Sequence, residues 1–478
     1  MGSKIPNTKK LIAIFLFVLA LIFSRVYNLD KTAHFIRDES SDLVNMHQIY
    51  IEKKLTLVGP ISEDGSEVFG SLTYYMLLPF AIIGHFDPVS TAYGAAFWGI
   101  LTGILLLYLT YKINKKIIYL IAPIIILWYP LVETGRWAWN PNLVPFWVSL
   151  SLIFFFRKGN LFKFFSGLAI GLSFHLHYIA ILSCIGLGLI ILFDSVKSKN
   201  LGGLVSYVCG IILTTLPFVI FDLRHPPGLF FSRFIYFNNL GGIANEKSIL
   251  NNIVLAFQGT FQYFIQSIYL EVALIFILIL LFYSDIKEKS RALFFIGVFL
   301  IQLAGVALVT NFFPRYIIQG VPFFFVYLIY PRKSTGKILS YLVLIVVIIT
   351  SILSFPKQIT AVAWENNTNS ARFISNTIYD EIVKNNLKNN NVIILASPDT
   401  NTIGSRYRNL LLIKGVTLRA KNEYQITDHL FVVSISDIDK VRNDPAYEVG
   451  NFRKGKLIRE WTVPESPWKI YLLSRSPT

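Results

Sequence analysis

The dominant feature of the sequence is a series of long apolar runs separated by short polar turns. The runs fill residues 11–355, whereas residues 356–478 have the mixed composition of a water-soluble protein. A helix needs about 20 mostly apolar residues to cross the hydrocarbon layer of a membrane. The pattern therefore predicts a polytopic α-helical membrane domain at 1–355 and a small soluble α/β domain at 356–478.

Two kinds of turn alternate along the apolar part. One kind is rich in lysine and arginine; the other carries acids, single arginines, histidines and aromatic residues, as in ETGRWAWNPN. Cytoplasmic loops hold the excess positive charge, so we expect a plasma- or inner-membrane protein with a cytoplasmic N-terminus and an extracytoplasmic C-terminal domain. The basic turns lie at 111–116, 157–163, 194–199, 285–291 and 331–337. At about 20 residues each, the predicted spans number about eleven, at 11–29, 89–111, 117–132, 141–156, 164–177, 179–193, 204–221, 269–284, 293–311, 316–330 and 338–355.

One apolar segment, LTYYMLLPFAIIG at 72–84, does not fit this alternation. If it crossed the membrane, the basic turn at 111–116 would lie outside and every later turn would be reversed. We therefore expect a short helix embedded at the outer face, inside a first external loop at 30–88, with Pro79 bending it. An ordinary crossing is the alternative.

The soluble tail predicts strands and at least one helix. Three segments, at 391–398, 429–435 and 468–475, are rich in β-branched and aromatic residues, which is typical of strands. A helix is expected near 369–388. These elements predict a small α/β domain.

The composition agrees with a membrane protein and argues against nucleic-acid binding. Only 15% of the residues are charged and 54% are hydrophobic, whereas soluble domains are about 25% charged. The net charge of +16 comes largely from the lysine-rich turns, so it orients helices and implies no nucleic-acid partner. Cys184 and Cys209 lie inside apolar runs and indicate neither a disulfide framework nor a metal site.

The first external loop opens with RDESSD directly after the first span. Asp38, Glu39 and Asp42 therefore lie at the membrane surface, with Asp38 and Asp42 one helical turn apart. Taken alone they are solvated boundary residues. Other predicted outer loops, however, add polar groups that a lipid interface does not require: Glu67, Glu133 with Arg136, His175 with His177, and Arg315.

These motifs resemble those of the C-type-fold glycosyltransferases of family thirty-nine, which include protein O-mannosyltransferases and lipid A aminoarabinose transferases. The resemblance rests on the order of the first span, the Asp38–Glu39 pair and a long loop with a tyrosine-rich embedded helix. The GRWAWNPN loop, and PRY at 314–316 followed by an apolar span with Pro322, add to it. It covers roughly residues 1–355.

The resemblance implies an inverting transfer of a monosaccharide from a polyprenyl-phosphate carrier to a hydroxyl of a lipid, glycan or protein acceptor. Asp38 matches the catalytic aspartate by position and would take the proton of the acceptor hydroxyl. Glu39 would bind the acceptor or tune Asp38. Arginine suits the departing phosphate because its planar fork stays protonated and binds in bidentate fashion. The candidates for the phosphate are Arg136, Arg315 and Arg224, and those for the acceptor pocket are Asp42, Glu133, Asn140 and Tyr316.

Purely structural roles are also possible for several of these residues. Arg136 and Arg315 also suit anchoring in an interfacial aromatic belt. A divalent metal held by Glu67, His175 and His177 is conceivable because some relatives carry one, but the match is loose and capping or interfacial histidines are the preferred explanation. No cofactor is therefore assigned.

Two other functions fit the same topology. A transporter or flippase of a lipid-linked sugar would place ionisable groups at mid-span, whereas the notable charges here cluster on the predicted outer side. A polymerase or ligase that uses a lipid-pyrophosphate oligosaccharide differs only in its donor, and the sequence does not separate it cleanly.

Overall fold

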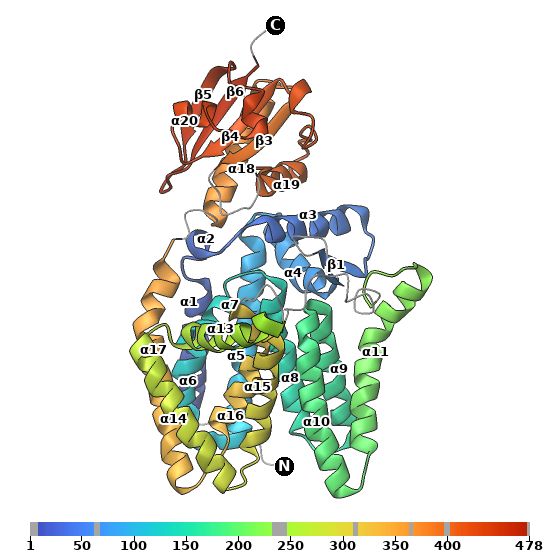
Figure 1. Ribbon diagram of the computed structural model, residues 1–478, viewed down its shortest axis with the longest axis vertical. Coiled ribbons are helices and arrows are strands. Elements are labelled where there is room, and N and C mark those ends of the chain that lie inside the picture. The colour runs from blue at the N-terminus through green and yellow to red at the C-terminus, as the bar shows by residue number, and fades with distance from the viewer. Residues whose placement is uncertain are drawn as a thin grey trace. The chain divides into compact units, whose positions relative to one another are not determined.

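The computed structural model describes residues 8–61, 67–231, 246–308, 314–362, 367–395 and 402–475 (Figure 1). The chain divides into two compact units. The bundle unit contains residues 1–27, 56–76 and 95–359, and the sheet unit contains 28–55, 77–94 and 360–478. The boundary predicted at 355/356 lies within the last helix of the bundle, and two earlier segments belong to the same unit as the C-terminal residues.

The bundle unit is built from apolar helices, and each predicted span coincides with helical structure over its described residues; residues 309–311 of the predicted span at 293–311 lie outside them. The helices are α1 (Thr8–Val26), α5 (Ser90–Asn114), α6 (Ile118–Leu127), α7 (Tyr129–Thr134), α8 (Val144–Phe155), α9 (Asn160–Leu176), α10 (Ile181–Ser198), α11 (Gly202–Arg224), α13 (Glu246–Ile265), α14 (Ile268–Lys287), α15 (Ala292–Ala307), α16 (Val321–Ile329) and α17 (Ser334–Thr360). Among the described residues, 5 helical segments are long and apolar enough to cross a membrane by length and composition. The chain is a multi-pass membrane protein, and the count of about eleven crossings stays a prediction.

Two predicted elements differ from the structure in instructive ways. The span at 117–132 is two helices, because the chain is extended at Trp128 and Pro130 begins a new turn in α7. Helix α13 was not predicted at all, and Figure 1 shows it lying across the direction of α15. The segment at 72–84 is the short helix α4 (Leu72–Ile83) with Pro79 inside, as expected. Its place at the outer face stays a prediction.

The sheet unit contains a four-stranded mixed sheet in the order β3-β4-β6-β5. Strands β3 (Asn390–Leu395), β4 (His429–Ser434) and β6 (Lys469–Ser474) confirm the three predicted strands, and α18 (Thr368–Lys384) confirms the helix. The edge strand β5 (Lys456–Thr462) was not predicted. β3 and β4 are parallel, and the other two pairs are antiparallel.

The sheet has a core on each face, which explains why β3 is buried along its whole length. On one face Ile374 and Ile378 of α18 and Leu411 of α19 (Ser405–Ile413) pack against Val392 and Ile394. On the other face Ile393 packs in a cluster with residues of the segments that follow β4. Figure 1 shows α18 and α19 lying along the sheet, and α19 provides the crossover between the parallel strands. The unit also contains α2 (Leu29–Thr32) and α3 (Arg37–Glu52), two helices from the start of the chain.

Candidate active site

The predicted catalytic carboxylates lie in the first turn of α3, in the sheet unit. Glu39 is buried, and its Oε2 accepts a hydrogen bond from the backbone N–H of Ile36 at 2.8 Å. It therefore caps the helix from its third position. Asp38 is half-buried beside it, and Asp42 is buried one turn further on. The positive end of the helix dipole favours carboxylates in this turn.

The C-terminal part of the chain holds α3 directly. Asn409 of α19 donates from Nδ2 to the hydroxyl oxygens of Ser40 at 3.0 Å and Ser41 at 3.2 Å. Both serines lie in the same turn region as Asp38. The C-terminal part of the chain thus helps to position the helix that carries the candidate base.

A second contact joins the tail to the segment before α3. Arg372 of α18 forms ion pairs with Asp30 at 2.9 Å and with Asp87 at 2.5 Å. The hydrogen bonds that Arg372 donates to Asp87 and Asp30 outweigh burial and raise the pKa of Arg372 above its usual value. Thr368 adds a hydrogen bond from its hydroxyl to the carbonyl of Asp30 at 2.6 Å. One arginine therefore connects three segments that are distant in sequence.

Arg136, which the sequence suggested as a phosphate ligand, instead donates hydrogen bonds to backbone carbonyls at the end of α1 in the bundle unit. Its guanidinium is 5% exposed and donates to the carbonyls of Ser24, Arg25 and Tyr27 at 3.2, 3.1 and 2.9 Å. The last carbonyls of a helix have no partner within the helix, so Arg136 satisfies groups that would otherwise be orphaned. Burial lowers the pKa of Arg136 to about 10.

Arg25 of α1 in turn donates to backbone carbonyls of the helices that precede Arg136. It is fully buried at the end of α1, and it donates to the carbonyls of Ile125 and Ile126, where α6 ends, and of Leu131 in α7. The break between α6 and α7 is therefore satisfied by a side chain of α1. The sequence contained a signal for this residue, because an arginine near the end of an otherwise apolar span calls for a buried partner.

Arg315 has different surroundings from Arg136. It lies in the short 3-10 helix η5 (Pro314–Gly320), and its Nη2 is 3.0 Å from the Oε1 of Glu133. The Arg315 side chain is 35% exposed and that of Glu133 is 11% exposed. Burial is the largest single influence and acts to lower the pKa of Arg315, but Glu133, Tyr129 and Tyr263 together outweigh it and raise that pKa. The Tyr129 hydroxyl donates to the same carboxylate oxygen at 2.9 Å.

A row of aromatic rings extends from this ion pair. The guanidinium of Arg315 lies 4.6 Å from the ring centre of Trp137, and Trp137 stacks on Trp139 at 5.0 Å. Trp139 stacks on Tyr316 at 5.8 Å, and the row continues to His177, 5.2 Å from Tyr316. The GRWAWNPN and PRY motifs, far apart in sequence, therefore meet in the bundle unit, which the prediction required.

Two other candidates take structural positions. Asn140 is buried in the 3-10 helix η2 (Asn140–Leu143), and its Nδ2 donates to the carbonyl of Leu176 at the end of α9 at 2.6 Å. Arg224 is the exposed last residue of α11 and contacts neither Glu133 nor Arg315 in the described chain. Asp222, two residues earlier, was missed by the sequence analysis. Its carboxylate accepts from the N–H groups of Leu229, Phe230 and Phe231 and shapes the loop after α11.

The histidines do not join Glu67 in a metal-ligand set. His175 donates from Nε2 to the carbonyl of Thr214 at 2.7 Å, and the Nδ1 of His177 accepts from the N–H of Ile179 at 3.3 Å. Glu67 is exposed just before β2 (Val68–Gly70). Within the described ranges, no group of three or more His, Cys, Asp or Glu residues could hold a metal ion. Each histidine instead supports local backbone structure.

Solved structures share the fold of this chain at low sequence identity. The chain is similar to the crystal structure of ArnT from Cupriavidus metallidurans in the apo state, with a TM-score of 0.61, 10% sequence identity, and coverage of 98% of this chain and 100% of ArnT. The structure of the same ArnT bound to undecaprenyl phosphate gives a TM-score of 0.59 at 10% identity, covering 99% of this chain.

The structural similarity extends further than the sequence resemblance. That resemblance covered roughly residues 1–355, whereas the matched region includes the C-terminal sheet as well. No protein-family model and no curated protein sequence matches the chain significantly.

Proposed function

We propose that the protein is an inverting glycosyltransferase that moves a monosaccharide from a polyprenyl-phosphate carrier to a hydroxyl acceptor at the outer face of the membrane. The observation that carries the proposal is the similarity of nearly the whole chain to ArnT, of which one structure binds undecaprenyl phosphate. Asp38 in the first turn of α3 and the partly exposed Arg315, paired with Glu133, supply the chemistry that such a transfer needs.

The proposed reaction uses one base. The acceptor oxygen attacks the anomeric carbon while Asp38 takes its proton, a glycosidic C–O bond forms, and the C–O bond to the carrier phosphate breaks. The phosphate leaves as an anion and needs no proton. General-base assistance of this kind contributes about 10²–10⁴-fold.

Arg315 is the best candidate for the leaving phosphate. It is partly exposed, its partner is a side chain rather than backbone, and a phosphate can replace or join the Glu133 carboxylate in its fork. Arg136 already donates to helix carbonyls, so in this proposal it positions the GRWAWNPN loop. The aromatic row beside Arg315 offers flat, amphipathic surfaces to the donor.

The proposal is tested by mass spectrometry of the purified protein. Asp38→Asn should abolish transfer while the folded protein retains a polyprenyl-phosphate sugar as a bound adduct. Asp437→Asn, at an exposed carboxylate of the tail, is the matched control and should turn over like the wild type.

Two results would contradict the assignments. Near-native transfer by Asp38→Asn would remove Asp38 as the base. A pyrophosphate-linked oligosaccharide as the retained lipid would favour the polymerase or ligase instead.

A further inference from the structure

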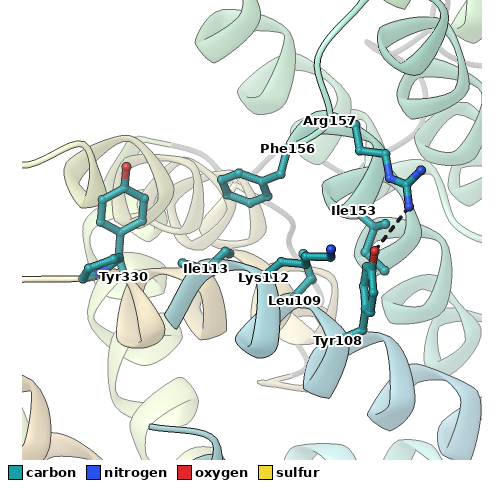
Figure 2. A pocket seen from close by; sticks show the side chains of 9 residues that line it. Tyr108, Leu109, Lys112, Ile113, Ile153, Phe156, Arg157 and Tyr330 are labelled. Atoms are coloured by element: carbon teal, nitrogen blue, oxygen red, sulfur yellow. Dashed lines mark hydrogen bonds between the residues drawn. The ribbon is translucent and has the colours of Figure 1, made fainter. Parts of the chain in front are cut away.

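A pocket lined by both cationic and apolar side chains lies in the bundle unit, at the helix ends that carry the lysine-rich turns. It has a volume of about 450 Å³ and is shown in Figure 2. Its walls come from the end of α5, the end of α8 with the turn that follows, and the turn after α16. Its lining residues are Tyr108, Leu109, Lys112, Ile113, Ile153, Phe156, Arg157, Tyr330 and Pro331.

Two cations and a hydroxyl converge on one side of this pocket. Figure 2 shows Lys112 and Arg157 both pointing toward Tyr108. The Nη2 of Arg157 donates to the Tyr108 hydroxyl oxygen at 3.2 Å, and the Nζ of Lys112 lies 5.4 Å from the Tyr108 ring centre. Because the Tyr108 oxygen accepts from Arg157, its own proton is left to donate. The three groups therefore offer several donors to one anion.

The charge of these two cations is not balanced by the protein. In the part of the chain that the structure describes, neither Lys112 nor Arg157 forms an ion pair with a carboxylate, and the pocket lining contains no acid. Arginines elsewhere in the basic turns do pair with carboxylates: Arg291 with Asp194 at 2.5 Å, and Arg332 with Asp285 at 2.8 Å. The pocket is thus a local site of uncompensated positive charge.

The rest of the lining suits a lipid rather than a small ion. Leu109, Ile113, Ile153 and Phe156 are apolar, and Tyr108 and Tyr330 are amphipathic aromatics of the kind enriched where membrane meets water. A phosphate held by the cations would leave its acyl chains against the apolar wall. Basic pockets between membrane helices on the cytoplasmic side bind anionic headgroups in this way.

We propose that this pocket binds the phosphate headgroup of an anionic phospholipid from the cytoplasmic leaflet. Lys112 and Arg157 hold the phosphate, Tyr108 donates to it, and the apolar wall contacts the acyl chains. The site lies among three turns predicted to face the cytoplasm, and its occupancy does not depend on the reaction proposed above.

The test compares two double variants with equal loss of charge. Lys112→Gln with Arg157→Gln removes the pocket cations, whereas Lys116→Gln with Lys158→Gln removes two exposed cations of the same turns that do not line the pocket. Native mass spectrometry then measures binding of phosphatidylglycerol, of phosphatidylethanolamine, and of phosphatidylglycerol in the presence of inorganic phosphate. Each cation that donates directly to the headgroup phosphate contributes about 1 kcal/mol, or about fivefold, whereas a cation that does not touch the lipid contributes little.

The pocket variant should therefore lose about 30-fold in phosphatidylglycerol affinity, and the control variant should bind like the wild type. Phosphatidylethanolamine binding should change little in either. An equal loss of phosphatidylglycerol affinity in both variants would show that the lipid responds to the overall charge of the turns, and it would overturn the proposed binding site. Displacement of the lipid by millimolar inorganic phosphate would show a site for free phosphate and overturn the lipid assignment, as would unchanged binding in the pocket variant.

Discussion

Arg136 and Arg315 belong to two loops of the same bundle unit, and the sequence predicts the same role for both. The structure gives them opposite surroundings. Arg136 is 5% exposed and donates to three backbone carbonyls, whereas Arg315 is 35% exposed and meets a carboxylate and an indole ring. Their pKa values move in opposite directions, down for Arg136 through burial and up for Arg315 because Glu133, Tyr129 and Tyr263 together outweigh burial.

The contrast separates arginines that hold a fold from arginines that can hold a ligand. If the arginine released a backbone carbonyl at a helix end, that carbonyl would lose its only hydrogen-bond donor. An arginine bonded in this way is therefore not available to bind a ligand. A side-chain partner such as Glu133 can rotate when a stronger anion arrives. Exposure and the type of partner, rather than residue type, decide which arginine is available.

The largest effect on stability is expected for Arg136→Ala. The variant leaves carbonyls of α1 without donors, and hydrogen bonds to charged groups contribute about 1.5–3 kcal/mol each. We expect the free energy of unfolding to fall by about 3 kcal/mol, with near-normal turnover per folded molecule. Thermal unfolding in detergent measures it, with Arg224→Ala as an exposed control. An Arg136→Ala variant that is stable but inactive would contradict the structural role given to Arg136 and would assign it to the reaction instead.

Arg315→Ala should do the opposite. The partly exposed ion pair with Glu133 contributes about 1 kcal/mol to stability, so the melting temperature should change little. Removing one preorganised donor from a developing charge typically lowers turnover by about 10²–10³-fold. Initial rates at varied donor and acceptor concentrations measure the loss. A similar loss of affinity for both substrates would indicate a structural role.

Arg372→Ala tests the link between the tail and the segment before α3. Its pairs with Asp30 and Asp87 are partly exposed, so we expect a loss of about 1.5 kcal/mol in unfolding free energy. Because α3 carries Asp38, turnover should also fall severalfold. Arg372→Lys keeps the charge but not the fork and should be intermediate. Protease susceptibility of the 28–36 segment reports the loosening, and an unchanged digestion pattern would argue against the link.

The smallest effect is expected at Glu39. Glu39→Ala removes the acceptor for the Ile36 N–H and should lower stability by about 1 kcal/mol. Glu39→Gln keeps an oxygen at that place and should be close to the wild type in stability and transfer. Complete loss of transfer in Glu39→Gln, with the fold intact, would place Glu39 in the chemistry beside Asp38.

The sequence predicted the elements whose pattern is local. Every predicted span is helical, the short helix at 72–84 exists, and three tail strands were found. Helix α13 was missed because Asn251, Asn252, Gln258 and Gln262 interrupt its apolar run. Strand β5 was missed because an exposed edge strand needs few apolar residues, and its sequence KLIREWT contains three charges.

The roles of the candidate residues were less predictable, because they depend on distant partners. The meeting of GRWAWNPN with PRY was expected only through the family resemblance. The use of Arg136 by the end of α1 depends on where that helix ends relative to a loop over a hundred residues later. No spacing rule contains that information.

The most direct test of the account is the side of the membrane on which the candidate residues lie. Single cysteines at positions 38, 315 and 114 are introduced after replacement of Cys184 and Cys209 by alanine, and sealed vesicles of known orientation are treated with an impermeant maleimide. The account predicts labelling at 38 and 315 from the outer side and at 114 only after permeabilisation. Labelling of 38 and 315 from opposite sides would contradict it, since the proposed reaction needs both residues on the side of the membrane where the donor headgroup lies.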